Sequence, residues 1–159
     1  MSKTALITGA SAGIGTELAR RFAIDRINLV LVARRRDRLE ALAGELSTTH
    51  GISVEVLPMD LTDAREREKL FHQLKEKGLA IDYLVNNAGF GDSGPFLESD
   101  WARQQEMIEL NITALSHLTR LFVPDMVQRR QGGLLNVAST AAFLPGPYMS
   151  VYYATKAYV

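Results

Sequence analysis

The sequence has no cysteine, no net charge and no long apolar run. Its 159 residues include 18 Lys plus Arg and 18 Asp plus Glu, which balance to a formal net charge of +0. The lack of cysteine excludes disulfide scaffolds, thiolate catalysis and cysteine-based metal sites. The balanced charge argues against a general nucleic-acid binder, whose affinity comes from neutralising phosphates. Because 47% of the residues are hydrophobic, the chain can form a core, and we do not expect disorder.

The N-terminal residues lack the apolar segment of a signal peptide. No apolar run approaches the roughly 20 residues that a helix needs to span a bilayer. We therefore expect no membrane span and a soluble, cytoplasmic protein. The length suits one domain, because domains usually have about 100–200 residues. We assign residues 1–159 to this single domain.

Short apolar runs alternate with longer amphipathic stretches along the chain. The runs have strand length and are nearly continuous in apolar character, as in strands buried on both faces. They predict strands at residues 4–8, 28–33, 53–57, 83–86 and 134–138. The stretches between them predict helices at residues 14–24, 36–49, 64–77, about 99–130, and from about 150 onward. This alternation predicts an α/β fold with a mostly parallel sheet and helices on both faces.

Several residues mark the expected ends of these helices. Asp63 and Ser99 are suited to cap helix N-termini. Gly51 and Gly78 follow predicted helices at positions where a C-terminal glycine is common. Pro124 lies inside the longest helical stretch, and we expect a kink or a break there because proline removes a backbone hydrogen bond.

Three glycines, Gly9, Gly13 and Gly15, stand between the first predicted strand and the first predicted helix. Glycine lets the backbone turn sharply and approach a ligand closely. The N-terminus of a helix offers free N–H groups and the positive end of a dipole, which suits a pyrophosphate. The spacing is not Gly-x-Gly-x-x-Gly, and no lysine follows Gly15 as in a phosphate-binding loop. A tight turn without a ligand is the alternative interpretation.

Arginines follow the second predicted strand at the point where NAD-specific folds place an acidic residue. Here Ala33 is followed by Arg34 and Arg35, and no acid occupies the expected position. A guanidinium group binds phosphate through a planar fork of donors, which favours the 2′-phosphate of NADP. A solvated basic start of the next helix is the alternative. A nucleic-acid patch is disfavoured by the neutral charge balance.

Tyrosines and a lysine stand at helical spacing near the end of the chain. Tyr152 and Lys156 are one turn apart, and Tyr153 also reaches Lys156 by its spacing of three residues. An ammonium group beside a phenol favours the phenolate, which makes a tyrosine usable as an acid or base. Ser139 follows the last predicted strand, near the sheet edge where ligands bind. Spacing alone does not choose between the two tyrosines, and an exposed pair without a function is the alternative.

Taken in order, these motifs resemble the short-chain dehydrogenase/reductase family of the classical type. Residues 8–15 match Thr-Gly-x-x-x-Gly-x-Gly, and residues 86–89 match Asn-Asn-Ala-Gly. Tyr152 and Lys156 match Tyr-x-x-x-Lys, which selects Tyr152 over Tyr153. Ser139 and Asn111 match the serine and the long-helix asparagine of the family. The resemblance covers the chain from end to end.

The resemblance implies hydride transfer between NADP, in preference to NAD, and a small carbonyl or alcohol substrate. The implied catalytic residues are Asn111, Ser139, Tyr152 and Lys156. Tyr152 is expected to exchange a proton with the substrate oxygen, and Ser139 to hydrogen-bond the same atom. Lys156 is expected to support Tyr152 and hold the ribose, and Asn111 to maintain a proton path. The implied cofactor-binding residues are Gly9, Ser11, Ala12, Gly13, Ile14, Gly15, Arg34, Arg35, Asp60, Leu61, Asn87, Ala88, Gly89, Tyr152 and Lys156. No metal site is expected.

The resemblance also implies a Rossmann-like, doubly wound parallel sheet with strand order 3-2-1-4-5. Family members continue well beyond the Tyr-x-x-x-Lys helix, so we expect this chain to be an N-terminal portion that is C-terminally truncated. The fifth strand is then an apolar edge. We expect a full-length version to form a homo-oligomer. Two interpretations stay open: an active oxidoreductase, or an inactive dinucleotide-binding fragment.

Overall fold

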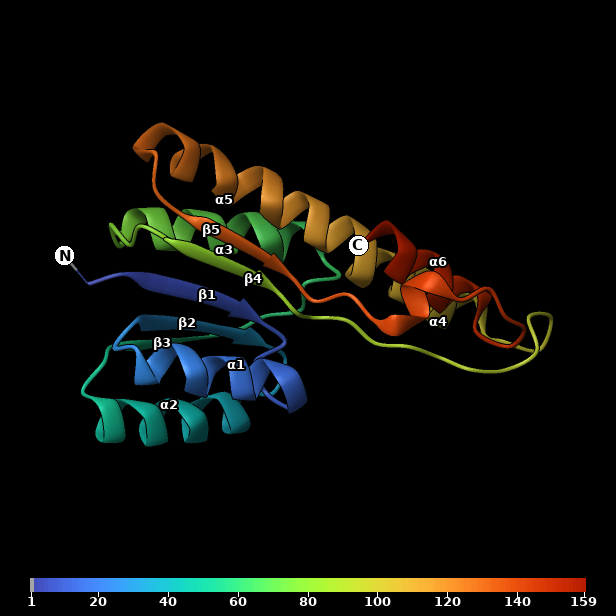
Figure 1. Cartoon of the computed structure of the whole chain (residues 1–159), viewed down its shortest axis with the longest axis horizontal. Helices are drawn as coiled ribbons and strands as arrows, with labels where there is room; N and C mark the ends of the chain where they lie inside the picture. Colours follow the sequence, from blue (N-terminus) through green and yellow to red (C-terminus); the bar gives the residue numbers. More distant parts are fainter. Residues whose placement is uncertain (1) are drawn as a thin grey trace.

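The computed structural model describes residues 2–159, and a five-stranded parallel sheet lies at its centre (Figure 1). The strands are β1 (Thr4–Thr8), β2 (Asn28–Ala33), β3 (Val54–Pro58), β4 (Tyr83–Asn86) and β5 (Gly133–Asn136). The helices are α1 (Gly13–Ile24), α2 (Arg36–His50), α3 (Ala64–Glu76), α4 (Trp101–Ile108), the π-helix η1 (Glu109–Ala114), α5 (Leu115–Arg129), the 3₁₀ turn η2 (Thr140–Phe143) and α6 (Ser150–Tyr158). The sheet order is β3-β2-β1-β4-β5, which confirms the predicted fold class.

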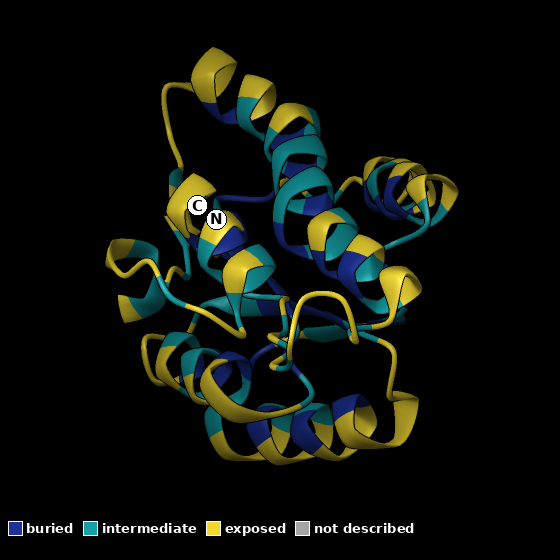
Figure 2. Cartoon of the chain, turned by 90° about the vertical axis from the view of Figure 1, so that its right-hand side faces the viewer, coloured by how far each residue is buried: buried dark blue, intermediate teal, exposed yellow. Residues whose placement is uncertain are grey.

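Each face of the sheet is covered by its own layer of helices. Along β1, Leu6 packs with residues of α3 and α5, whereas Ala5 and Ile7 pack with residues of α1 and α2. All three side chains are 0% exposed. Figure 2 shows the burial of the helices: the sides that face the sheet are buried, and the sides that face outward are exposed. Burial on both faces explains why the strands are nearly continuous apolar runs in the sequence.

The predicted strands and the first three helices agree with the observed ones to within two residues. The largest difference is at β5, which ends at Asn136 and not at residue 138. Asn136 pairs with Asn86, the last residue of β4, so the neighbouring strand ends at the same level. The carbonyl of Val137 instead accepts a hydrogen bond from the Nζ of Lys156 at 3.0 Å.

The long helical stretch is divided differently from the prediction. Its N-cap is Asp100 and not Ser99, because the carboxylate of Asp100 accepts from the backbone N–H of Ala102 at 3.0 Å. Pro124 does not break α5, which continues to Arg129. Pro124 and Arg120, whose carbonyl loses its helical partner, are both exposed, so water can replace the missing bond. The change in helix type occurs earlier, at η1.

The β5 strand forms one edge of the sheet, as the resemblance implies. Its side chains Leu134 and Leu135 are 44% and 43% exposed. No helix within residues 2–159 combines the length and the apolar character needed to cross a membrane.

Asp82 lies at the amino ends of the strands, on the opposite side of the sheet from their carboxyl ends, and connects several segments there. Its carboxylate accepts hydrogen bonds from the backbone N–H of Thr4 at 2.9 Å, from Arg129 at 2.9 Å and from Gln131 at 3.2 Å. Burial of Asp82 works against its charge. The hydrogen bonds from Arg129 and Thr4 outweigh that effect and hold the pKa of Asp82 below its ordinary value.

We predict that Asp82→Asn lowers the free energy of unfolding by about 1.5–3 kcal/mol near neutral pH, since charged hydrogen bonds are lost. A depressed folded-state pKa stabilises the protein above the unfolded pKa. The difference from wild type is therefore full above roughly pH 5 and shrinks as the pH falls below it. Urea unfolding between pH 3 and pH 7 measures this difference. Asp125→Asn, at an exposed position of α5, is the control. If the free energy of unfolding of Asp82→Asn differed from that of wild type by the same amount at every pH, the result would contradict the account.

Candidate active site

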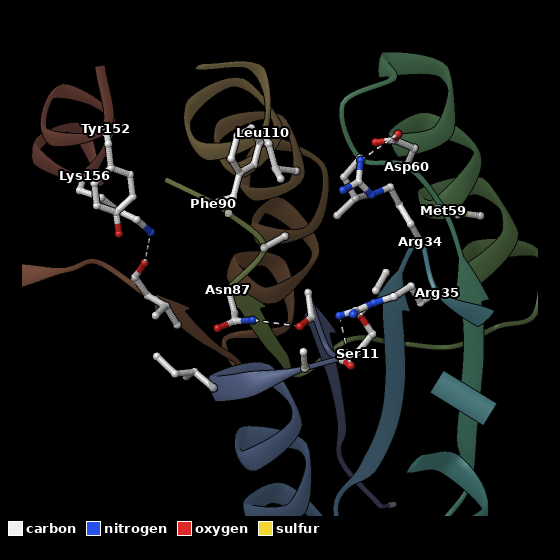
Figure 3. A pocket seen from close by; sticks show the side chains of 18 of the residues that line it. Ser11, Arg34, Arg35, Met59, Asp60, Asn87, Phe90, Leu110, Tyr152 and Lys156 are labelled. Atoms are coloured by element: carbon white, nitrogen blue, oxygen red, sulfur yellow. Dashed lines mark hydrogen bonds and ion pairs between the residues drawn. The ribbon is translucent and has the colours of Figure 1, made fainter. Parts of the chain in front are cut away.

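A cavity of about 570 Å³ lies at the carboxyl ends of the five strands (Figure 3). It lies across the β1–β4 boundary, where the order of the strands reverses along the chain. Ligands of open parallel sheets bind at this place, because the loops on the two sides diverge there. The cavity is lined by Gly9, Ser11, Ala12, Ile14, Ala33, Arg34, Arg35, Met59, Asp60, Leu61, Asn87, Ala88, Gly89, Phe90, Arg103, Leu110, Val137, Ala138, Tyr152 and Lys156.

Most of the residues expected from the sequence lie in this lining, and a few do not. Those outside it are Gly13, Gly15, Asn111 and Ser139. The lining also contains residues that the sequence analysis did not select: Ala33, Met59, Phe90, Arg103, Leu110, Val137 and Ala138. Several of these are direct neighbours of selected positions. Arg103 and Leu110 come from the long helical stretch; Leu110 directly precedes Asn111, whereas no motif points to Arg103.

The loops after β1 and β4 are joined by a tight set of hydrogen bonds. The Asn87 side-chain amide donates to the carbonyls of Thr8 at 2.9 Å and Gly9 at 3.3 Å. The Thr8 hydroxyl accepts from the N–H groups of Asn87 at 3.0 Å and Ala88 at 2.9 Å. A Cβ on Gly15 would lie 2.4 Å from the carbonyl oxygen of Gly9, so this approach requires glycine.

The start of α1 is suited to a phosphate group. Its N-cap, Ala12, supplies no side-chain hydrogen bond, so the first N–H groups of the helix are available to a ligand. Ser11, Ala12 and Ile14 line the cavity at this point. Gly9 turns the chain with a φ of +66° and would carry a Cβ 2.9 Å from Ala88 Cα. Because this tight turn carries no side chain at Gly9, space for a pyrophosphate remains beside the N-terminus of α1. The residues present therefore fit a dinucleotide.

The two arginines after β2 have different surroundings (Figure 3). Arg35 lies over the turn after β1, where its Nη2 and Nε donate to the Ser11 hydroxyl at 3.0 Å and 3.3 Å. Arg34 instead pairs with carboxylates, Glu106 at 3.1 Å and Asp60 at 3.8 Å. Within residues 2–159, the side-chain hydrogen bonds of Arg35 all go to Ser11. Arg35 is therefore the better placed of the two to bind an added phosphate.

Tyr152 and Lys156 reach the other end of the cavity from α6 (Figure 3). Lys156 is 8% exposed, and burial lowers the pKa of its ammonium group. The Tyr152 ring packs so closely on Gly91 that a Cβ there would lie 3.0 Å from it. Tyr153 packs in the same way on Gly146 and does not line the cavity. The structure thus separates the two tyrosines that spacing alone leaves equivalent.

Ser139 lies three residues beyond the end of β5, at the N-cap of η2. Its hydroxyl oxygen accepts from the backbone N–H of Ala141 at 3.1 Å. Because this bond uses a lone pair of the oxygen, the hydroxyl proton is free to be donated.

Asn111 lies in η1 and is 1% exposed. Its side-chain oxygen accepts from the Phe90 N–H at 3.1 Å. Its side-chain nitrogen donates to the Phe90 carbonyl at 2.9 Å and to the Thr155 hydroxyl at 3.0 Å. The side chain thus connects the loop after β4 to α6. Short π-helical segments often occur at functional sites, and no apolar pattern in the sequence points to this one.

Comparisons with known proteins agree with this geometry. A family model described as short chain dehydrogenase matches residues 3–159. The very-long-chain 3-oxoacyl-CoA reductase of Phaeosphaeria nodorum is 37% identical, over 98% of this chain and 47% of that protein. The 17-beta-hydroxysteroid dehydrogenase type 3 of Mus musculus is 37% identical, over 100% of this chain and 52% of that protein. The chain thus spans about half the length of these relatives. A solved short-chain dehydrogenase from Sphingobium yanoikuyae, in complex with NADPH, has a TM-score of 0.92 and 43% identity, over 99% of this chain and 61% of that one.

We predict that Gly15→Ala lowers the free energy of unfolding by about 1–3 kcal/mol, because the added methyl group meets backbone that cannot move freely. Gly44→Ala is the matched control: Gly44 is also inside a helix, but a Cβ there meets nothing within 4 Å. That substitution should stabilise the protein by about 0.5–1 kcal/mol. Denaturant unfolding of both variants measures the contrast. Equal stability of Gly15→Ala and wild type would show that the close approach is not needed.

Proposed function

The chain belongs to the short chain dehydrogenase family, and we propose that it binds NADP and catalyses hydride transfer to or from a carbonyl or alcohol substrate. One observation carries the proposal: a single cavity has the glycine-containing turn after β1 and Arg35 at one end and Tyr152 and Lys156 at the other. The complex of the Sphingobium yanoikuyae relative with NADPH supports this choice of cofactor.

Each part of the cavity would hold a different part of the cofactor. The N-terminus of α1 would bind the pyrophosphate, since it offers N–H groups and the positive end of the helix dipole. Arg35 would bind the 2′-phosphate through its fork of donors. Asp60 and Leu61 would border the adenine, and residues 87–89 the adjoining ribose.

The reacting groups are supplied by α6 and by the start of η2. When bound, NADP accepts or supplies the hydride. Tyr152 would donate its proton to the carbonyl oxygen in reduction and recover it in oxidation. The Lys156 ammonium group would stabilise the tyrosinate that remains. Ser139 would donate its free hydroxyl proton to the same substrate oxygen.

An inactive dinucleotide-binding fragment is the less supported alternative. A fragment that only binds a dinucleotide needs the turn after β1, but it has no use for a lysine that is 8% exposed beside a tyrosine in the same cavity. Tyr152 also borders a second, small cavity with a mixed lining, in which Phe96 and Met149 lie beside polar residues such as Asp92 and Gln104. Assays of turnover should therefore include ketones with polar and with apolar substituents.

We predict that Arg35→Asp weakens NADPH binding about 10- to 150-fold and leaves NADH binding unchanged or tighter. This range corresponds to the loss of a charged hydrogen bond, about 1.5–3 kcal/mol. Calorimetric titration with both cofactors measures the change. Arg36→Asp is the matched control, because Arg36 pairs with Glu40 and does not line the cavity. Wild-type binding of NADH that equals or exceeds binding of NADPH would refute the cofactor assignment.

We predict that Tyr152→Phe lowers kcat by about 10²–10⁴-fold and preserves NADPH binding, because only the acid–base group is removed. The matched Tyr153→Phe variant should keep turnover, since Tyr153 packs on Gly146 outside the cavity. NADPH oxidation with a panel of ketones and aldehydes, in the complete protein that contains this chain, measures both. If Tyr153→Phe alone lost turnover, the assignment of Tyr152 as the acid–base residue would be wrong.

A further inference from the structure

Thr155 stands between the two cavity residues of α6 but does not line the cavity itself. It is 1% exposed. Its hydroxyl donates to the carbonyl of Tyr152 at 2.8 Å and accepts from the side-chain amide of Asn111 at 3.0 Å. The bond to the Tyr152 carbonyl is of a kind that threonine side chains commonly make inside helices. The bond to Asn111 is different, because it joins α6 to η1 through two residues that are 44 positions apart in the sequence.

The Asn111 amide leaves Thr155 little freedom. Its oxygen and its other N–H are both bonded to the backbone of Phe90, at 3.1 Å and 2.9 Å. Gly89 adds to this constraint, because a Cβ there would lie 2.9 Å from the amide oxygen of Asn111. The amide is therefore held in one orientation by the loop that follows β4. A continuous series of hydrogen bonds runs from this loop through Asn111 and Thr155 to the backbone of Tyr152.

We propose that Thr155 is a positioning residue whose hydroxyl holds α6 against the loop after β4 and so places Tyr152 in the cavity. The inference rests on the proposed function, because it concerns the residue that would transfer the proton. A displacement of about 1 Å at a reacting group can lower a rate on the order of a hundredfold. Removing the hydroxyl should therefore affect turnover more than cofactor binding.

The chain contains a matched control in Thr119. Its hydroxyl donates to the Leu115 carbonyl at 2.7 Å and accepts from the side-chain amide of Asn86 at 3.0 Å. Thr119 thus makes the same pair of bonds on α5, and it does not line the cavity. Replacing each threonine by valine keeps the shape of the side chain and removes the hydroxyl. A general cost of losing such a hydroxyl appears in both variants, and a loss of positioning appears only at Thr155.

The test measures kcat and the NADPH dissociation constant for T155V, T155S and T119V in the complete protein that contains this chain. We expect T155V to lose about 10- to 100-fold in kcat, with NADPH binding close to wild type. T155S keeps the hydroxyl and should restore most of the rate, and T119V should turn over like wild type. Equal kcat in T155V and wild type, or equal losses in T155V and T119V, would overturn the inference.

Hydrogen–deuterium exchange provides a readout that needs no turnover. We expect the amides of α6 to exchange faster in T155V than in wild type, T155S or T119V. If wild type reduces no carbonyl compound, the proposed function fails and exchange decides the present inference. Faster exchange of α6 in T155V alone then supports the positioning role, and equal exchange in all four proteins overturns it.

Discussion

The close approach of the loops after β1 and β4 is the constraint on which the cavity depends. The Asn87 amide reaches the carbonyls of both Thr8 and Gly9, and the first turn of α1 lies against the same backbone. Side chains at Gly9 or Gly15 would occupy this space. Because the loops meet here, the N-terminus of α1 faces the cavity at the point where the strand order reverses. The end of the cavity proposed to bind the phosphates thus follows from backbone packing at the centre of the sheet.

The other end of the cavity depends on α6, which is held by backbone groups and by the side-chain bond between Thr155 and Asn111. Lys156 donates to the Val137 carbonyl, and the Tyr152 ring packs on the backbone at Gly91. Asn111 extends this pattern, since its amide is bonded to both backbone groups of Phe90. Polar side chains that are buried among backbone partners have few alternative positions. We therefore expect the geometry of Tyr152 and Lys156 to be set before a substrate binds.

The parts that local patterns determine could be predicted from the sequence, and the parts that depend on distant partners could not. Strands β1, β2 and β4 have the predicted bounds, because burial on both faces makes them continuous apolar runs. The end of β5 depends on where β4 ends, and Pro124 predicts a kink or a break in a stretch that α5 continues through to Arg129. The residues that follow β2 include both Arg34 and Arg35. Only the structure shows that Glu106, 72 residues from Arg34, pairs with Arg34 and not with Arg35. Thr155 is an unspecified position within Tyr-x-x-x-Lys, and its bond to Asn111 requires the folded chain.

The central claim is that this cavity brings a nicotinamide and a carbonyl group together for direct hydride transfer. NADPH that carries deuterium at both C4 positions of the nicotinamide tests it most directly. The complete protein that contains this chain is incubated with the labelled cofactor and a ketone in ordinary water, and the alcohol is analysed by mass spectrometry and NMR. The account predicts one deuterium at the carbinol carbon and none elsewhere. An alcohol whose carbinol carbon carries only hydrogen from the solvent, or the absence of any alcohol, would contradict it.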